Sequence, residues 1–353
     1  MKILFLANEL LQVCGVSKHL YYLVDGLQKY YPNNEYFIIT GGGNAIQKFQ
    51  SLGVPVIVNE NLRHETRSIT GYIKGIKEVY SFVKRNDIQI VHSHHHYAAN
   101  IATVVSKFKD VKTILTNHGV LPEVGRLNHF NAEHIIAVND HIKDHCVSKK
   151  IKLEKEISVI RCGLPDPHCQ KRNAHKLKVL AGGRFVKEKG FHHYIQAVAH
   201  LNKEIKNLAE FYIAGSGQEE KNLIELDQKL KANIIFLGAC ENFQEKLCES
   251  HIFVNPTLSE AEGFPTVLIE AGLAKNLVLS SKFRGHENIL NADNSILLNI
   301  TDHHIFVNKL EDAIINYKNY SEIIEQFNVS VLQYFSISTM LEKTNMLYKK
   351  LSM

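Results

Sequence analysis

The sequence contains no apolar run close to the roughly 18 residues that a membrane-spanning helix requires. Its first residues, Met1 to Leu6, are mostly apolar, but the chain turns polar at Asn8 and Glu9, which is too early for a signal peptide. The same short run is typical of a first buried strand. We therefore expect a cytoplasmic protein, and association with the cytoplasmic face of a membrane stays open.

Cysteines are few, and they lack the spacing of a metal or redox motif. None of the six forms a Cys-x-x-Cys pair, the positions being Cys14, Cys146, Cys162, Cys169, Cys240 and Cys248. In a reducing compartment such cysteines are free thiols, so we expect no disulfide framework. His168 beside Cys169 does not complete the four-ligand pattern of structural zinc.

An excess of charge of one sign is also missing. The formal net charge is only +5, and no basic run is interleaved with aromatic residues. Nucleic-acid binding domains usually show both features, so we expect no nucleic-acid partner.

What is present is an alternation of short apolar runs with segments of helical periodicity. A chain of 353 residues that is 45% hydrophobic and 22% charged suits two globular domains. Strands that alternate with helices predict parallel α/β sheets. The expected strands are residues 2–7, 35–40, 54–58, 88–92, 113–116, 135–138 and 157–160, followed by 177–181, 211–214, 234–237, 252–254 and 277–280.

The alternation pauses at residues 161–176, a polar stretch with two prolines that is typical of a linker. We expect a Rossmann-like domain at 1–163, a linker at 164–176 and a second Rossmann-like domain at 177–335. A C-terminal helix, residues 336–353, should return toward the domain junction. In this architecture two doubly wound domains face each other across a cleft, and ligands bind at the carboxyl ends of the strands.

Three glycine-bearing loops compete as phosphate sites. Residues 14–17 (CGVS) open the first expected helix, where backbone N–H groups and the helix dipole could meet an anion. A simple helix-start glycine explains Gly15 equally well. Residues 41–43 lack a dinucleotide fingerprint and indicate a flexible loop. Residues 215–220 place two acids where a phosphate would lie, which disfavours a dinucleotide and hydride transfer.

A cationic loop, GGRFVKEKG at residues 182–190, follows the first strand of the second domain. Its glycines let the backbone bend sharply, so that Arg184 and Lys189 can project from the carboxyl end of the sheet. Arginine offers a planar fork for phosphate oxygens, and lysine adds a mobile point charge. The alternative is an exposed charged turn without a ligand.

Two glutamates frame the next motif, SEAEGFPTVLIEA at residues 259–271. Pro265 suits the first turn of a helix, and Gly263 allows close approach of the backbone to a ligand. Glu262 and Glu270 are eight residues apart, which at helical rise is roughly 12 Å, about the reach from a sugar past two phosphates to a ribose. Because Glu270 has apolar neighbours in the sequence, a solvated helix face explains it poorly.

One further absence bears on this pair. The sequence contains no Asp-x-Asp, the carboxylate pair that commonly holds a divalent metal on a nucleotide diphosphate. Arg184, Lys189 and two helix N-termini could neutralise a leaving diphosphate instead, so we expect no metal and no cofactor.

Taken together, these residues resemble the retaining, GT-B-fold glycosyltransferases of family 4, the "glycosyl transferases group 1" family. The resemblance covers nearly the whole chain. The matching segments are residues 2–8 with the Gly15 loop, 90–94, 116–119, 159–165, 183–184 with 189–190, 214–217 and, as the most specific element, 262–270, which matches the E-x7-E motif of the family.

The resemblance implies a role for each matching side chain in the second domain. Arg184 and Lys189 would bind the donor diphosphate and stabilise the leaving group. Glu262 would contact the transferred sugar near the reaction centre, and Glu270 would hold the ribose hydroxyls. No protein nucleophile is implied; the leaving phosphate would help to deprotonate the acceptor on the same face of the sugar.

Backbone groups and the first domain are implied to complete the site. The amides of Gly263, Phe264 and Thr266 would approach the sugar. Gly15 would lie by the phosphates, and His118 would reach the donor sugar.

The implied function is metal-independent transfer of a hexose or N-acetylhexosamine from a nucleotide-diphosphate sugar, with UDP-sugar favoured. The acceptor would be a glycan or lipid-linked saccharide in lipopolysaccharide or other surface-polysaccharide synthesis, with peripheral contact at the inner membrane surface. The alternatives are a GT-B relative with other chemistry, such as a sugar epimerase or phosphorylase, and an inactive nucleotide-sugar-binding subunit.

Some residues depart from the pattern of the family or fall outside it. Cys14 stands where the family often has a second glycine, and Arg284 could add a cation at the diphosphate. The histidines at positions 92, 94, 95 and 96 suggest a metal, but no carboxylate or cysteine lies near them in the sequence. We therefore favour a role for this strand end in lining the acceptor site.

Overall fold

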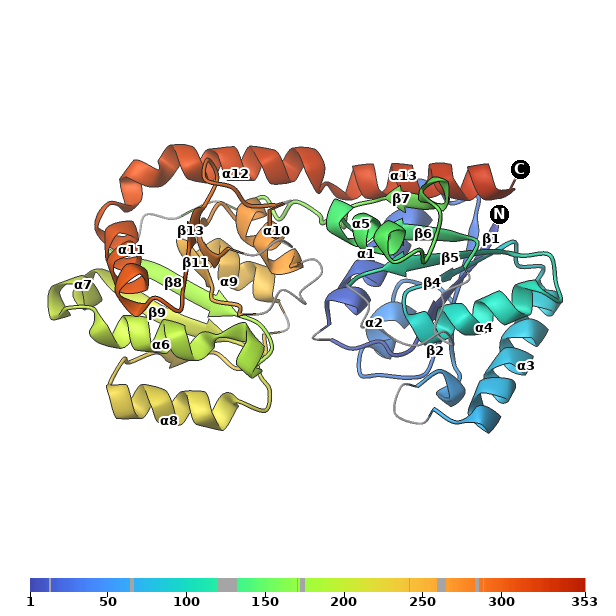
Figure 1. Ribbon diagram of the computed structural model, residues 1–353, viewed down its shortest axis with the longest axis horizontal. Coiled ribbons are helices and arrows are strands. Elements are labelled where there is room, and N and C mark those ends of the chain that lie inside the picture. Colours follow the sequence, from blue (N-terminus) through green and yellow to red (C-terminus); the bar gives the residue numbers. More distant parts are fainter. Residues whose placement is uncertain are drawn as a thin grey trace. The chain divides into compact units, whose positions relative to one another are not determined.

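The computed structural model describes residues 1–12, 14–63, 67–119, 132–169, 171, 175–240, 242–258, 265–282, 286–287 and 289–352 (Figure 1). It divides into two compact units, Met1–Pro165 with Ser336–Met353, and Asp166–Phe335. Each unit is built on one parallel sheet with helices on both faces.

The first unit contains a parallel sheet with the order β3-β2-β1-β4-β5-β6-β7. Its strands are β1 (Lys2–Ala7), β2 (Glu35–Thr40), β3 (Val56–Val58), β4 (Ile90–Ser93), β5 (Lys112–Asn117), β6 (His134–Ala137) and β7 (Ile157–Val159). Its helices are α1 (Gly15–Tyr30), α2 (Ile46–Gln50), α3 (Ile69–Asn86), α4 (His96–Ser106), α5 (Asp140–Ser148) and α13 (Ile337–Ser352), with short 3-10 turns at Glu60–Leu62 and Glu154–Glu156.

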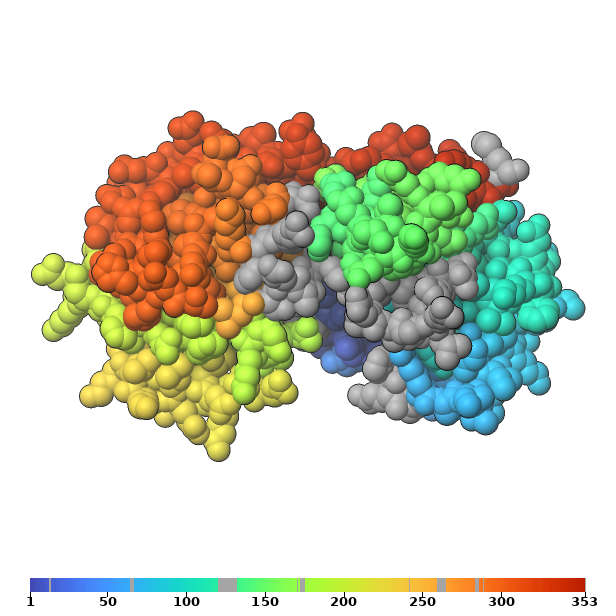
Figure 2. Space-filling model, viewed as in Figure 1, coloured from blue at the N-terminus to red at the C-terminus, as the bar shows by residue number. Residues whose placement is uncertain are grey.

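Alternating side chains of β1 divide the core of this unit into two halves. Ile3 and Phe5 pack with the apolar faces of α1 and α13, whereas Leu4 and Leu6 pack with α3 and α4. Both faces of the strand are therefore buried, which is why a central parallel strand has a continuous apolar sequence. Helices α3 and α4 form much of the surface of the first unit in Figure 2, in light blue and teal.

The C-terminal helix α13 belongs to the first unit. Gly26 of α1 lets it approach closely, because a Cβ there would lie 2.5 Å from a methyl carbon of Leu341. The buried Tyr348 hydroxyl lies 2.6 Å from Nδ1 of His92, whose Nε2 lies 2.7 Å from the Thr116 hydroxyl. His92 thus holds α13 to the sheet through Nδ1, while its Nε2 bonds to the neighbouring strand β5.

The second unit contains a parallel sheet with the order β10-β9-β8-β11-β12-β13. Its strands are β8 (Leu177–Gly182), β9 (Ala209–Ala214), β10 (Ile235–Phe236), β11 (Ile252–Asn255), β12 (Leu277–Ser281) and β13 (Ile296–Leu298). Its helices are α6 (Phe191–His200), α7 (Lys203–Leu208), α8 (Glu220–Leu230), α9 (Phe243–Glu249), α10 (Thr266–Leu273), α11 (His303–Ile315) and α12 (Ser321–Tyr334), with 3-10 turns η4 (Lys187–Lys189) and η5 (Tyr317–Tyr320).

The prediction of two doubly wound, Rossmann-like α/β domains is confirmed. The sequence did not predict β13, which is only three residues long. Among the described residues, no helix combines the length and hydrophobicity needed to span a bilayer.

The expectation that every cysteine is a free thiol is wrong for one pair. Cys169 and Cys248 are joined by a disulfide across a sequence separation of 79 residues. Lys171, two residues after Cys169, holds this segment beside the end of α9. Its ammonium group donates hydrogen bonds to carbonyl oxygens there, including those of Leu247 (2.9 Å) and Ser250. This pairing also removes Cys169 from any metal site with Cys162 and His168.

Candidate functional site

The first part of the candidate site lies at the carboxyl ends of β8 and β11 in the second unit. The order of strands reverses between these two neighbours, and such a switch point is where open α/β sheets bind ligands. The loop after β8 and the loop after β11 are joined here, because Leu258 N and the Thr257 hydroxyl both donate to the Glu188 carbonyl, at 2.6 and 3.1 Å.

Arg184 and Lys189 both lie on the loop after β8, as the sequence predicts. The Arg184 side chain is exposed and that of Lys189 is half-buried. A Cβ placed at Gly183 would be 3.9 Å from Cδ and Cε of Lys189, so the lysine stem runs back along this glycine. Two cations are therefore carried at the end of the strand at which a ligand of this fold would bind.

Gly190 ends this loop in a conformation that only glycine adopts easily. It has φ +65° and is the N-cap of α6. A Cβ at this position would lie 1.9 Å from the Pro256 carbonyl oxygen, on the loop after β11. The backbone can fold back behind Lys189 only because this side chain is missing.

The loop after β9 braces the cationic loop from the other side. Phe185 N donates to the Ser216 carbonyl at 2.8 Å, and Glu219 N donates to the Phe185 carbonyl at 3.0 Å. A Cβ at Gly215 would lie 1.9 Å from the Gly183 carbonyl oxygen. The Gly-Ser-Gly sequence therefore allows backbone-to-backbone packing under the cations.

Helix α10 carries the carboxylate of the candidate site. It begins at Thr266, with Pro265 as its N-cap, and contains Glu270. The Glu270 side chain is only 4% exposed among Leu268, Ile269 and Ala271, which are also buried. Desolvating a carboxylate is costly, so a buried one usually serves a specific interaction. Glu262, Gly263 and Phe264, together with Arg284, lie outside the described residues.

In the first unit, Gly15 is the first residue of α1. The helix follows β1, and the switch point of this sheet lies between β1 and β4. Asn8, after β1, donates its backbone N–H to Nδ1 of His95 at 3.1 Å, which ties the loops after the two strands together. The N-terminus of α1 thus lies at the carboxyl ends of the strands, where open α/β sheets bind ligands.

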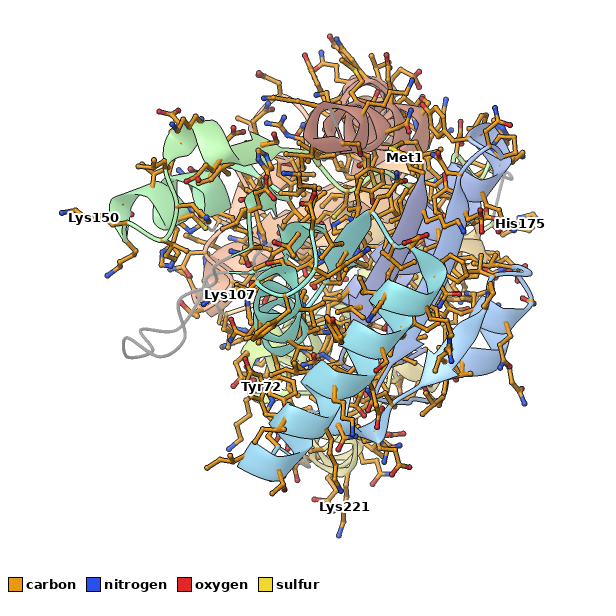
Figure 3. The ribbon with its side chains drawn as sticks, turned by 90° about the vertical axis from the view of Figure 1, so that its right-hand side faces the viewer. Met1, Tyr72, Lys107, Lys150, His175 and Lys221 are labelled. Carbon is orange, nitrogen blue, oxygen red and sulfur yellow. A yellow bond between two sulfur atoms is a disulfide. The ribbon has the colours of Figure 1, made fainter. Side chains whose placement is uncertain are left out.

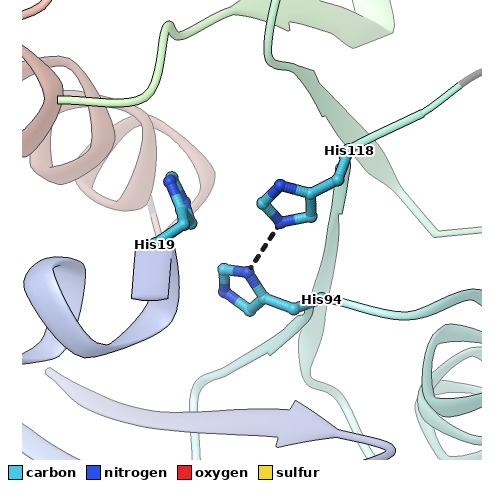
Figure 4. Close-up of side chains that lie close together, drawn as sticks. All are labelled: His19, His94 and His118. Atoms are coloured by element: carbon cyan, nitrogen blue, oxygen red, sulfur yellow. Dashed lines mark hydrogen bonds between the residues drawn. The ribbon is translucent and has the colours of Figure 1, made fainter. Parts of the chain in front are cut away.

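His118 follows β5 directly and lies in a group with two other histidines (Figure 4). Its Nε2 is 3.3 Å from Nδ1 of His94, which follows β4. His19, from the second turn of α1, has its ring 4.8 Å from that of His118 and 5.5 Å from that of His94. The structure therefore separates the neighbouring histidines of the sequence: His92 is fully hydrogen-bonded to the core, and only His94 joins this group.

The three rings are held in their neutral form. Burial lowers the pKa of His19 to about 4. Burial, and then the charge of neighbouring histidines, hold the pKa values of His94 and His118 well below the ordinary 6.5. Sequence reasoning missed His19; the available signal was its position one turn after Gly15, on the helix that starts at the switch point.

Family models match both halves of the chain. Residues 13–166 match the model described as "Glycosyltransferase Family 4", and residues 168–328 match "Glycosyl transferases group 1". The two matches meet at the boundary between the two units. Both halves are thus glycosyltransferase domains.

Two curated relatives show partial similarity. One is a Campylobacter jejuni α-1,4-N-acetyl-D-galactosaminyltransferase whose name specifies a diNAcBac-PP-undecaprenol-linked acceptor; it is 29% identical over 143 residues, 40% of this chain and 39% of the relative. The other is the lipopolysaccharide core biosynthesis glycosyltransferase LpsE of Rhizobium meliloti, 26% identical over 161 residues, 45% of each chain. The similarity therefore spans less than half the length of these relatives.

Solved structures match over the full length. HepE of Anabaena in complex with UDP has a TM-score of 0.83 at 16% identity and covers 99% of this chain and 100% of that one. At this identity the match establishes the fold alone, and the predicted GT-B class is confirmed.

Proposed function

We propose that this chain, which carries a glycosyltransferase domain in each half, transfers a hexose or N-acetylhexosamine from a UDP-sugar to a glycan or lipid-linked saccharide with retention of configuration. One observation carries the proposal. At the switch point of the second unit, the loop after β8 supplies two cations, Arg184 and Lys189, and the helix after β11 supplies the buried carboxylate of Glu270.

The two cations suit the diphosphate of the donor. Cleavage of the bond between the sugar and the phosphate leaves negative charge on the diphosphate, and preorganised cations stabilise that charge as it develops. The N-terminus of α10 adds the positive end of a helix dipole. The UDP complex of the structurally similar HepE supports uracil as the base.

The carboxylates suit the two ends of the donor. Glu270 lies on the second turn of α10, where its buried carboxylate can accept hydrogen bonds from ribose hydroxyls. Glu262 and the amides of Gly263, Phe264 and Thr266 are assigned to the sugar by the family resemblance. In the first unit, Gly15 and His118 are assigned by the same resemblance to the phosphates and the sugar.

Chemically, the C1–oxygen bond to the diphosphate breaks while the acceptor hydroxyl oxygen bonds to C1 on the same face. The acceptor proton passes to a phosphate oxygen of the leaving group. The chain then binds, orients and stabilises charge, and supplies no nucleophile of its own.

A lipid-linked acceptor is supported by the names of the curated relatives, which specify an undecaprenol-linked saccharide and a lipopolysaccharide core. Exposed apolar side chains lie near both ends of α3 in the first unit. Ile69 and Ile73 at its start are 82% and 60% exposed, and Phe108, which is 70% exposed, precedes Lys109, the partner of Asp87 at the end of α3. Lys74 follows Ile73 in the sequence, and Lys107 and Lys109 flank Phe108. Lys107 is labelled in Figure 3, which looks onto α3 and α4. Apolar and cationic side chains in this mixture suit peripheral contact with an anionic membrane.

Glu270→Gln and Glu262→Gln should separate donor binding from transfer. Glu270→Gln keeps the shape but loses the charged acceptor, so UDP affinity should fall about 10–100-fold. Glu262→Gln should leave UDP affinity within a few-fold and slow donor turnover instead. Calorimetric titration with UDP and measurement of UDP release check the two effects, with Glu225→Gln on the exposed face of α8 as the control. If both variants change only the affinity, the division of roles is wrong.

Transfer should not depend on an added divalent metal. Arg184 and Lys189 occupy the place in the mechanism that a metal on the diphosphate would take, so treatment with EDTA should leave the rate of UDP release unchanged. Loss of activity in EDTA that added Mg²⁺ or Mn²⁺ restores would contradict this account of the leaving group.

A further inference from the structure

His19, His94 and His118 form a group that we call the histidine triad. One ring nitrogen from each can be chosen so that all three lie within 4.8 Å of one another, and His19 and His94 are buried. The residues come from α1 and from the ends of β4 and β5, so three separate elements of the first unit bring them together (Figure 4). His94 is fixed by its own backbone N–H, which donates to the Leu6 carbonyl at 3.0 Å.

The ring nitrogens of the triad are less fully hydrogen-bonded than those of the core histidine His92. His92, two residues before His94, has both of its nitrogens in hydrogen bonds. In contrast, Nδ1 of His19 and Nε2 of His94 are buried and have no hydrogen-bond partner among the described residues. A buried polar atom without a partner costs about 1–3 kcal/mol, so the unpartnered Nδ1 of His19 points to a ligand. His94 would contribute its Nδ1, the nitrogen that faces His118.

We propose that the histidine triad is a binding site for a divalent transition metal, principally Zn²⁺. Three imidazoles with no carboxylate among the described members of the group favour Zn²⁺, Cu²⁺ or Ni²⁺ and disfavour Mg²⁺ and Ca²⁺. In a tetrahedral zinc site with bonds of about 2.0–2.1 Å, two nitrogens lie about 3.3–3.4 Å apart. The 3.3 Å between Nδ1 of His94 and Nε2 of His118 matches this spacing.

Three protein ligands leave the fourth position of the metal open. In zinc proteins this position holds a water or an oxygen of a bound molecule. The ligands of the triad all belong to the first unit, whereas the cations assigned to the diphosphate, Arg184 and Lys189, belong to the second. Metal at the triad is therefore compatible with a transfer reaction that needs no metal at the diphosphate.

Inhibition of transfer by Zn²⁺ is a consequence that rests on the proposed function. His118 is the histidine assigned to the donor sugar, and a metal-bound nitrogen can no longer contact that sugar. Metal binding itself can be measured without any donor or acceptor, so failure of the metal site and failure of the proposed function would be recognised separately.

The test uses the full chain without a histidine tag, freed of metal and titrated with Co²⁺. We expect one Co²⁺ per chain with the intense visible absorption of four-coordinate cobalt, and displacement by one equivalent of Zn²⁺. His19→Asn and His94→Asn should each weaken binding at least about 100-fold, since loss of even an outer partner of a metal ligand costs 10–100-fold. His303→Asn is the control, because it breaks another close pair, His200 and His303, whose rings are 4.4 Å apart.

The wild-type spectrum decides the question even if a variant fails to fold, which circular dichroism would reveal. Absence of stoichiometric Co²⁺ binding, or only the weak spectrum of six-coordinate cobalt, would overturn the proposal. So would binding that persists in folded triad variants or that disappears in His303→Asn.

Discussion

Replacing Lys189 with alanine should slow donor turnover by about 100–1000-fold, the loss usually seen when one preorganised group that stabilises developing charge is removed. The ammonium group of Lys189 is carried at the carboxyl end of β8, and in the proposed reaction it stabilises the diphosphate as the bond to the sugar breaks. UDP affinity should fall as well, because UDP carries the same diphosphate. UDP release from the donor and calorimetric titration with UDP measure the two effects.

Lys187 provides a matched control for this prediction. It is an exposed lysine on the same 3-10 turn, two residues before Lys189. Lys187→Ala removes the same charge from the same segment, so a general electrostatic effect would appear in both variants. Equal losses in the two variants would show that Lys189 has no specific role at the diphosphate.

Gly190→Ala should reduce the free energy of unfolding of the second unit by about 3 kcal/mol, because it combines a strained backbone with a collision. Gly190 has φ +65°, and an added Cβ would lie 1.9 Å from the Pro256 carbonyl oxygen. The loop that carries Arg184 and Lys189 would have to move away from the loop after β11. UDP affinity should therefore fall together with the free energy of unfolding. Urea denaturation measures the free energy of unfolding, and calorimetric titration measures the UDP affinity.

Gly238→Ala is a control that separates the strain of the left-handed backbone from the collision with Pro256. Gly238 has φ +67°, nearly that of Gly190, but a Cβ there meets nothing within 4 Å. Gly238→Ala should cost only about 1–2 kcal/mol, the price of the left-handed conformation. If the two variants lose the same stability, contact with Pro256 does not hold the cationic loop in place.

The strands could be predicted because a parallel sheet covered on both faces requires continuous apolar runs. Each strand of the first unit lies within two residues of its predicted position, and β1 matches at both ends. The three-residue β13 was missed, although β3 and β7 are equally short and were predicted. Glycine and proline likewise marked the loop after β8 and the start of α10.

Contacts between residues that are distant in the sequence could not be predicted. Alternation along β4 placed His92 and His94 on one face, but the partner that satisfies His92 is Tyr348, 256 residues away. His19 lies on a helix far from both in sequence, and Cys169 is bonded to Cys248, 79 residues away, beside the Lys171 contact with the end of α9. The positions of Arg184, Lys189 and Glu270 were predictable because Gly182 and Gly183 precede the loop that carries the two cations, and Pro265 precedes the helix that carries Glu270.

The central claim is that the second unit binds the nucleoside diphosphate of a sugar donor, and calorimetric titration of the full chain with UDP, GDP and ADP tests it most directly. We expect that UDP binds with one site per chain, that GDP and ADP bind more weakly, and that Lys189→Ala loses most of the UDP affinity while Lys187→Ala retains it. If none of the three nucleotides binds the wild-type protein, the proposed function is wrong.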